Sequence, residues 1–207
     1  LYFELAKRCE KEKIVDCKAA YGYWPCVPEG NTLVFLDPKD SSKVAARFTF
    51  PRQNGKQGRC ITDYFHVREG KPDVVALQVV TIGQRASDVA REWFAADKYQ
   101  DYLHLHGFGV EVAEGLAEYV HRQIRGELGL ADSDAREMSV LFKQGYRGSR
   151  FSFGYPACPN LEDQGPLLEL LGAEKLGITL SEEFQLHPEQ STSAIVCHHP
   201  SAKYFTL

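Results

Sequence analysis

The chain has 207 residues, of which 43% are hydrophobic and 25% are charged. This length suits one large domain or two small ones, with enough chain to bury a core. No apolar run approaches the roughly 18 residues that a membrane span needs, and no signal-peptide pattern opens the chain. The net charge of −4 argues against a broad nucleic-acid-binding surface. We therefore expect a soluble globular protein without a membrane or nucleic-acid partner.

The charge is uneven along the chain. Residues 1–72 contain 13 Lys and Arg against 9 Asp and Glu, a net charge of +4, whereas residues 73–207 contain 11 against 19, a net charge of −8. A basic face in the first third would complement an acidic protein partner, since opposite charges steer encounter. A solvated sheet edge is the alternative explanation.

Six cysteines are scattered along the chain without a C-x-x-C pair. A disulfide scaffold would be shorter and denser in cysteine, so we predict reduced thiols in a cytoplasmic protein. Cys197 and His199 would share a face of a strand, and with His198 they form the strongest candidate for a metal site. Because such a site needs three or four ligands, we expect no metal.

The first half of the chain is predicted to contain one helix and four strands. Apolar residues recur among charged ones at helical spacing in residues 1–15. The run at 74–80 is nearly continuously apolar, which indicates a central strand buried on both faces. A polar, Gly-rich loop is expected at 52–59. The other predicted strands cover residues 19–24, closed by Pro25 and Pro28, then 32–36 and 47–50.

Helices are predicted in the middle of the chain. Ser87 is the expected N-cap of the first one, and His106-Gly107-Phe108-Gly109 is expected to bend or close-pack the helical stretch that follows. The next helix is predicted to bury one face made of Val112, Leu116, Tyr119, Val120 and Ile124.

Short elements are predicted toward the end of the chain, where residues 146–160 are expected to be irregular. Short helices are predicted at 134–143 and at 167–171, the latter opened by Pro166 and closed by Gly172. Strand-like pieces surround Ile178, Phe184 and residues 194–196. Because strands come early and late with helices between them, the order favours an α+β fold over an alternating α/β fold.

Several common catalytic motifs are absent from the sequence. There is no GxGxxG after a strand, no GxxxxGK[ST] and no GxSxG. A Rossmann-type dehydrogenase or methyltransferase is therefore disfavoured. A free-standing methyltransferase of another class would need its own acceptor site, for which we find no motif.

The segment 145–159 has the most unusual composition, with three glycines, two prolines, four aromatic residues and two arginines. Glycine lets a ligand approach the backbone closely, and irregular backbone leaves amide groups free to bind. Arginine can hold a carboxylate through two parallel hydrogen bonds. The segment therefore indicates a binding loop, with a rigid structural loop as the alternative.

Six motifs along nearly the whole chain have a specific pattern: Arg150-x-x-x-Gly154-Tyr155-Pro156-Ala157-Cys158-Pro159, Ala113-Glu114-Gly115-Leu116-Ala117-Glu118-Tyr119-Val120-His121, His199-Pro200-x-x-Lys203-Tyr204-Phe205, Tyr21-Gly22-Tyr23-Trp24-Pro25, Phe48-x-Phe50-Pro51-Arg52 and Asp63-Tyr64-Phe65. Together they resemble the C-terminal activation domain of cobalamin-dependent methionine synthase. The resemblance implies one domain over residues 1–207, with a twisted, mainly antiparallel sheet and flanking helices.

The resemblance implies that the domain binds S-adenosylmethionine and presents its methyl group to reduced cobalamin on a neighbouring module. It thereby reactivates the enzyme, a 5-methyltetrahydrofolate–homocysteine methyltransferase, with flavodoxin or a similar electron donor. Reduced cobalt is already a strong nucleophile and a sulfonium is a good leaving group, so the protein supplies positioning and we expect no catalytic side chain. The alternative is an interaction module that keeps the fold but has lost the ligand.

The resemblance also implies roles for single residues. Arg150 would hold the methionine carboxylate, and Glu114 would favour the ammonium or sulfonium cation. The backbone from Phe151 to Ala157, which includes Pro156, would cradle the ligand, and Gly154 would permit its approach. Tyr155 would lie at the rim facing the corrin, and Tyr204 and Phe205 would contact the nucleoside.

The family also uses an aspartate upstream, which no residue of this chain matches. Together with Leu1, this departure implies an N-terminally incomplete domain of a larger multimodular chain. Loss of one charged hydrogen-bond partner would weaken ligand binding about ten- to hundredfold.

Overall fold

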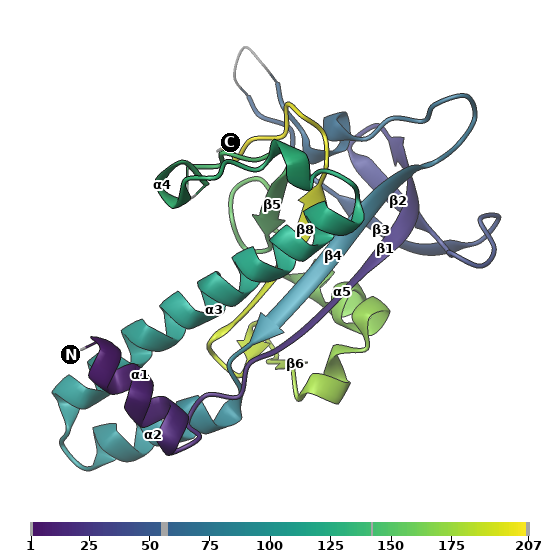
Figure 1. Ribbon diagram of the computed structural model, residues 1–207. Helices are drawn as coiled ribbons and strands as arrows, with labels where there is room; N and C mark the ends of the chain where they lie inside the picture. Colours follow the sequence, from purple (N-terminus) through teal and green to yellow (C-terminus); the bar gives the residue numbers. More distant parts are fainter. Residues whose placement is uncertain (1, 55–57, 142, 206–207) are drawn as a thin grey trace.

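A six-stranded antiparallel sheet in the order β3-β2-β1-β4-β8-β5 forms the centre of the computed structural model, which describes residues 2–54, 58–141 and 143–205 (Figure 1). The predicted α+β fold with a mainly antiparallel sheet is confirmed. Leu1 of the first predicted helix, residues 55–57 of the predicted loop and residue 142 lie outside the described residues. The strands of the sheet are β1 (Lys18–Glu29), β2 (Thr32–Leu36), β3 (Val44–Thr49), β4 (Asp73–Thr81), β5 (Ser149–Ser152) and β8 (Ser191–Cys197).

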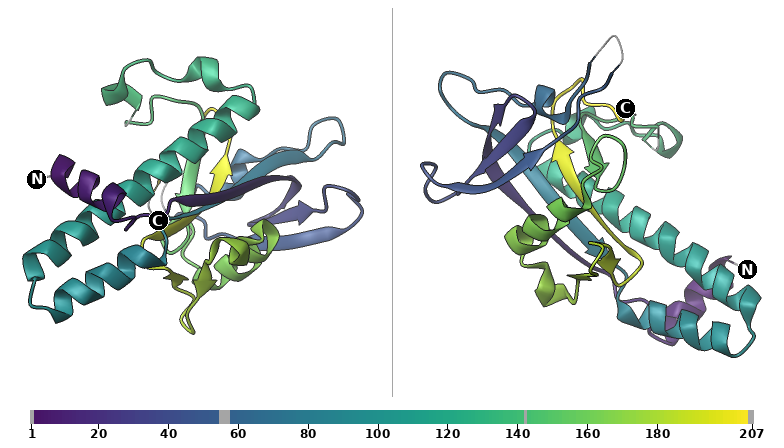
Figure 2. Two further views of the ribbon diagram at one scale, coloured as in Figure 1. Left: turned by 60° about the horizontal axis from the view of Figure 1, so that its bottom comes forward. Right: turned by 180° about the vertical axis from the view of Figure 1, so that it is seen from behind.

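Strand β4 is central and buried on both faces, as its apolar run predicted. Alternate side chains point to opposite faces of a strand, so β4 contributes to two cores. Leu77 lies in the larger core with α5 (Gln164–Leu171), whereas Val80 packs with residues of α3 (Tyr99–Glu127). The two helices therefore cover opposite faces of the sheet (Figure 2).

Helix α3 is continuous over 29 residues. Of the two alternatives predicted for residues 106–109, a bend or close packing, the second is found at Gly109, where a Cβ would lie 3.0 Å from side-chain atoms of both Ile82 and Gln190. The predicted buried face was partly wrong. Tyr119 is 59% exposed, and the buried positions of the second half are Ala113, Ala117, Val120, His121, Ile124 and Arg125.

A second helical layer lies at one end of the molecule, where α1 (Tyr2–Lys11) and α2 (Gln84–Ala95) pack beside the first half of α3 (Figure 1). Helix α2 begins at Gln84 after Gly83, so the prediction of Ser87 as N-cap was wrong. Ser87 is buried within the helix, where its hydroxyl donates to Gln190 Oε1 at 3.3 Å. The packing requirement at this position outweighed the capping preference of serine.

Strand β1 runs through both prolines that were predicted to close it. Pro25 pairs with a residue of β4, but the pairing of β1 with β2 begins only after it. Pro28 pairs with a residue of β2, but the pairing of β1 with β4 has already ended before it. Each proline thus has one side without a paired strand, which is where a residue without an amide hydrogen is tolerated.

The remaining elements are short and connect the layers. Helix α5 is closed by Gly172, whose φ is 59°, as predicted, but it begins at Gln164 and not at Pro166, which was predicted to open it. Phe184 is not in a strand and lies in the turn between β6 and β7, where its φ of 59° excludes extended backbone. These elements are η1 (Ile61–Tyr64), η2 (Ala131–Ser133), α4 (Met138–Leu141), η3 (Leu161–Asp163), η4 (Ala173–Leu176), β6 (Thr179–Leu180) and β7 (Leu186–His187).

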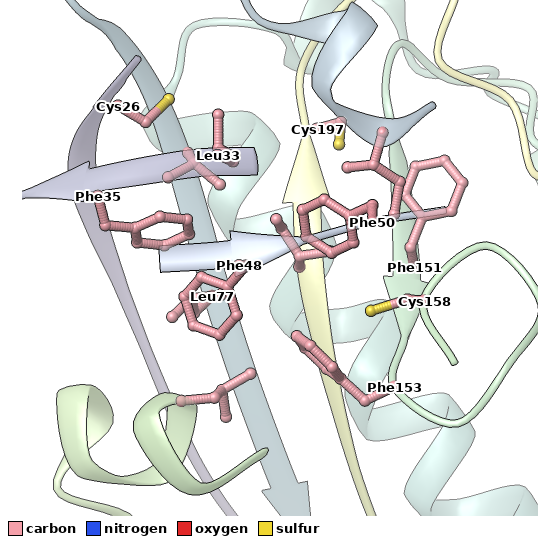
Figure 3. Packing of buried hydrophobic residues seen from close by; sticks show 14 of the residues in the cluster. Cys26, Leu33, Phe35, Phe48, Phe50, Leu77, Phe151, Phe153, Cys158 and Cys197 are labelled. Atoms are coloured by element: carbon pink, nitrogen blue, oxygen red, sulfur yellow. The ribbon is translucent and has the colours of Figure 1, made fainter. Parts of the chain in front are cut away.

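Strand β5 lies inside the segment that was predicted to be irregular, and it forms the sheet edge beside β8. Phe151 of β5 and the following Phe153 are buried in the larger core, where they lie near Phe48 and Cys158 (Figure 3). The alternate residues Arg150 and Ser152 are only half-buried. The edge strand thus fixes the position of Arg150 through its buried neighbours.

The six cysteines are free thiols, and five of them are buried. Burial raises the pKa of the Cys26, Cys158 and Cys197 thiols, which keeps them protonated. In the described ranges, no helix combines the length and apolar character needed to cross a bilayer.

Replacing Gly148 with alanine is expected to destabilise the fold by about 1–3 kcal/mol. Gly148 has φ of +89°, and a Cβ would lie 2.4 Å from the Cys197 carbonyl oxygen of β8. Urea unfolding of Gly148→Ala measures the loss. The control is Gly115→Ala in α3, where nothing lies within 4 Å of the added Cβ. There we expect a gain of about 0.5–1 kcal/mol, and equal stability of the two variants would contradict this account.

Candidate functional site

An open groove of about 470 Å³ lies between α3, strand β5 and the end of the described chain. Helix α3 contributes Glu114, and β5 contributes Arg150 and Ser152, whose alternate spacing places them on the same face. The groove therefore combines a charged end with aromatic walls. Its remaining lining residues are Gln144, Tyr146, Tyr155 and Tyr204.

Arg150 is the central charged group of this groove. Its Nη2 donates to Glu114 Oε2 at 2.9 Å, and its Nη1 donates to Glu118 Oε2 at 2.6 Å. The two glutamates are four residues apart on α3, so they project from one helix face. Their exposure differs, with 54% for the Glu114 side chain and 20% for that of Glu118. Arg150 thus bridges an exposed carboxylate and a largely covered one.

A buried arginine continues this network behind the groove. The Arg125 side chain is 1% exposed, and its Nε and Nη2 donate to Asp134 at 2.9 and 2.8 Å. Both Nη atoms also donate to Glu118 Oε1 at 3.3 Å. The guanidinium lies 3.9 Å from the centre of the Tyr146 ring, which adds a cation–π contact.

The network contains three carboxylates and two guanidinium groups, so one negative charge is in excess. Glu118 and Asp134 balance the two arginines in the interior. The unbalanced carboxylate is therefore that of Glu114, which is also the most exposed member. A cationic group on a ligand would be favoured at this end of the groove.

Two titratable groups, Tyr146 in the lining of the groove and the buried His121 beside it, are held in their neutral forms. Burial lowers the pKa of His121 well below its ordinary value, and the charges of Arg125 and Arg150 lower it further. Burial raises the pKa of Tyr146 to about 12, and the Glu118 carboxylate contributes to that rise. The two rings are in edge contact at 5.1 Å. The charge pattern of the groove is thus fixed by its arginines and carboxylates.

Tyr204 contributes an aromatic ring to the groove and is backed by further rings. The Tyr204 ring is stacked on Phe151 with centroids 6.2 Å apart and an interplanar angle of 22°. Phe151 in turn is stacked on Tyr64 at 6.0 Å. Phe205 packs against Phe151 from within the core and is 5% exposed. Of the closing aromatic pair, only Tyr204 therefore presents a ring to the groove.

The structure brings together four of the eight residues singled out in the sequence. Arg150, Glu114, Tyr155 and Tyr204 line the groove, and Tyr155 is 56% exposed at its rim. The other four do not line it. Gly154 begins a tight turn, in which its amide donates to the Cys158 carbonyl oxygen at 2.9 Å. Pro156 is exposed, whereas Ala157 and Phe205 are buried in the core.

Gly154 nonetheless has a position that requires glycine. Its φ is +88°, and an added Cβ would lie 2.9 Å from Leu161 Cδ2. A larger residue would therefore displace the turn on which Tyr155 is carried. Gly154 shapes the rim through the backbone, and the space that it leaves is occupied by Leu161.

A second, smaller hollow of about 220 Å³ shares Glu114 and Tyr155 with the groove. Its far side is polar, with Gln164 and Ser193 among its lining residues. The Ser193 hydroxyl donates to Gln164 Oε1 at 2.7 Å, and Gln164 Nε2 donates to the Phe184 carbonyl at 2.7 Å. Glu114 and Tyr155 thus line two neighbouring depressions.

The candidate metal ligands do not form a site in the described residues, where no group of three or more His, Cys, Asp or Glu is placed to hold an ion. Cys197 is fully buried in the core, and His198 Nε2 donates to Asp73 Oδ1 at 2.8 Å. Although burial raises the pKa of Asp73, the hydrogen bonds that it accepts from His198 and from the His66 and Val74 amides lower it to about 2.

Sequence reasoning missed the roles of Glu118, Arg125, Gln144, Tyr146 and Ser152. Two signals were present. Glu118 follows Glu114 by four residues on a predicted helix, and Ser152 alternates with two phenylalanines after Arg150. Nothing local marked Arg125 as buried, because charged residues at helix ends are ordinarily solvated. Gln144 lines the groove from a backbone position with a left-handed φ of 56°, which the local sequence does not predict.

The fold and groove together define an α+β domain with an open groove, whose charged groups lie on an edge strand and the helix beside it. The family model that describes the activation domain of vitamin B12-dependent methionine synthase matches residues 3–207. The chain therefore belongs to this family, and the resemblance noted in the sequence is confirmed.

Two curated relatives support the assignment. The chain is 51% identical over 206 residues to the methionine synthase of Mycobacterium tuberculosis (strain ATCC 25618 / H37Rv), and 47% identical over 199 residues to that of Mycobacterium leprae (strain TN). The matches cover 94% and 90% of this chain but 17% and 16% of those proteins. The chain thus spans about a sixth of the length of these relatives.

A solved structure has the same fold. The crystal structure of the MetH reactivation domain bound to AdoHcy superimposes with a TM-score of 0.89 and 24% sequence identity. The match covers 99% of this chain and 65% of that chain. It supports the arrangement of the sheet and helices throughout this chain.

Acid is expected to destabilise the chain through His121. The histidine stays neutral in the folded chain but takes up a proton below about pH 6.5 in the unfolded chain. The free energy of unfolding is therefore unaffected by this group above that pH and decreases below it. Between about pH 7.5 and about pH 5.5 this linkage removes about 1.4 kcal/mol. Urea unfolding at both pH values should show a smaller drop for His121→Phe than for the wild-type chain.

The control for this measurement is His104→Gln on the same helix, which is half-buried and should retain the wild-type drop. If His121→Phe lost as much stability as the wild-type chain on acidification, the buried neutral histidine would not be the cause.

Proposed function

We propose that this domain binds S-adenosylmethionine in the groove between α3 and β5 and presents its methyl group to reduced cobalamin. The observation that carries the proposal is the ion pair of Arg150 with the exposed Glu114 at 2.9 Å. An amino-acid zwitterion has one group for each partner, because its carboxylate matches the guanidinium and its ammonium matches the glutamate.

Ligand binding would break the ion pair between Arg150 and Glu114 and form two new ones, each between one of these residues and the ligand. The Glu114 side chain is 54% exposed, so swinging away from Arg150 breaks a contact of small net stability. The ligand carboxylate then takes the Nη2 side of Arg150, and the ammonium takes Glu114. S-adenosylmethionine carries one net positive charge, which offsets the excess negative charge of the network. No charge needs to be buried without a partner in this exchange.

The aromatic wall suits the nucleoside end of the same ligand. Tyr204 presents a ring that is already stacked on Phe151, and a purine can lie against such a surface. Tyr155 is exposed at the rim, where the sulfonium in the middle of the ligand would meet an incoming partner. The related reactivation domain was crystallised with AdoHcy, the demethylated form of this ligand.

The chemistry requires positioning more than side-chain catalysis. Methyl transfer from the sulfonium to reduced cobalamin on a neighbouring module, which would supply the nucleophile, would leave S-adenosylhomocysteine as the product. Arg150 and Glu114 hold the amino-acid end of the ligand, and the open groove leaves the sulfonium methyl accessible. The site accordingly needs no general base.

The domain would act as the reactivation part of a methionine synthase, a methyltransferase of methionine biosynthesis in the cytoplasm. Its proposed partners are the cobalamin-binding module of the same enzyme and flavodoxin or a similar electron donor. The net charge of +4 in residues 1–72 supports an acidic donor, since complementary charge accelerates encounter.

Replacing Arg150 with alanine is expected to weaken S-adenosylmethionine binding about ten- to hundredfold, because a charged hydrogen bond contributes about 1.5–3 kcal/mol. Isothermal titration calorimetry measures the change. The control is Arg122→Ala on the exposed face of α3, which should bind as the wild-type chain does. Equal binding by Arg150→Ala and the wild-type chain would rule out the role of the arginine. Absence of binding in the wild-type chain would favour an interaction module that has lost the ligand.

Cobalamin reduction in the complete enzyme is expected to depend steeply on salt when flavodoxin is the donor. Raising the ionic strength from low to physiological values should slow the reduction about tenfold or more, since screening removes electrostatic steering. A small neutral chemical reductant provides the control and should be nearly insensitive to salt. If the two donors responded equally, docking through the basic region would be wrong.

A further inference from the structure

Glu118 occupies a different place in the network from Glu114, although the two lie one helical turn apart. Its Oε2 accepts from Arg150 Nη1 at 2.6 Å and from the Tyr146 hydroxyl at 3.3 Å. Its Oε1 accepts from both Nη atoms of Arg125 at 3.3 Å. One carboxylate thus contacts two guanidinium groups and a phenol.

The partners of Glu118 are themselves fixed. Arg125 is almost completely buried, is held by Asp134 through two nitrogens, and lies over the Tyr146 ring. Moving Glu118 would therefore leave a buried arginine with one carboxylate fewer, which is unfavourable in a poorly solvated place. Glu114 has no such constraint, because its side chain is more than half exposed.

Glu118 also lies behind the groove and is not among its described lining residues. A ligand in the groove would meet Arg150 and Glu114 first. The side chain of Glu118 therefore acts on the ligand only through the orientation of Arg150.

Arginine has several rotatable bonds, and fixing it on ligand binding costs about 0.5–1.5 kcal/mol per side chain. The 2.6 Å contact with Glu118 restricts this freedom before any ligand arrives. On the basis of the proposed function, we infer that Glu118 is a positioning residue for carboxylate recognition, which holds the Nη1 side of Arg150 so that its Nη2 side is presented to the ligand.

The inference distinguishes the two glutamates by ligand chemistry. A ligand without a carboxylate gains nothing from a correctly oriented Arg150, yet it still presents its cations to Glu114. The probes are S-adenosylmethionine and its decarboxylated analogue, which keeps the amine and the sulfonium. The wild-type chain should bind S-adenosylmethionine about ten- to hundredfold more tightly than the analogue.

Glu118→Gln keeps the size of the side chain but removes the charge that both arginines share. We expect it to weaken S-adenosylmethionine binding about three- to tenfold more than it weakens analogue binding, because both ligands lose the attraction of one negative charge but only S-adenosylmethionine also loses the oriented arginine. The matched variant Glu114→Gln should weaken both ligands by similar factors, since both carry cations. Calorimetric titration of the two variants with the two ligands gives the four affinities needed.

A structural role for Glu118 would produce a different result. If Glu118→Gln weakened both ligands equally, or neither, the positioning role would be wrong. If Glu118→Gln did not fold, Glu118→Asp would decide, because it keeps the charge and shortens the reach by one methylene; the same selective loss is expected. Failure of the proposed function would be visible separately, as absence of S-adenosylmethionine binding or of carboxylate preference in the wild-type chain.

Discussion

The two-residue alternation of strand β5 ties the candidate site to the core. Phe151 is fully buried, and its neighbour Arg150 must then face the opposite side of the sheet edge, toward α3. A shift of one residue in the pairing of β5 with β8 would exchange the two and bury a charge. The position of the arginine is therefore maintained by the same apolar burial that stabilises the domain.

The helix facing this strand is organised by a complementary pattern. Positions 114, 118, 121 and 125 recur at spacings of four, three and four, so they form one stripe along α3. The exposed end of the stripe carries the unbalanced carboxylate, and the buried end carries Arg125 with its two carboxylate partners. A buried ion pair contributes little net stability, because desolvation offsets the attraction. Here the buried pairs of Arg125 fix the position of Glu118, which in turn holds Arg150 at the edge of the groove.

The sequence predicted the elements with strong periodicity and the motifs with specific spacing. Strand β4 could be predicted because its apolar run is continuous, and Arg150 because its loop resembles a known signature. The sequence left open whether residues 106–109 bend the helix or pack closely, because glycine allows both; the structure shows close packing at Gly109, where Ile82 and Gln190 approach α3. The burial of Phe205 could not be anticipated, because adjacent aromatic residues give no indication of which ring enters the core. Arg125 was missed for a related reason, as its partner Asp134 lies beyond the end of the helix.

The openness of the groove is consistent with a ligand that must react with a group on another module. An enclosed pocket would bury more of the ligand and bind it more tightly, but it would hide the methyl group. The alternative is to concentrate recognition at the two ends of the ligand that do not react. In the proposed complex the charged end would be held by a network anchored in the interior, and the aromatic end by Tyr204, which is stacked on the core residue Phe151. The rim carried by the Gly154 turn would stay accessible, because Tyr155 is exposed there. Fixed ends and an accessible middle would let binding and transfer use different parts of one ligand.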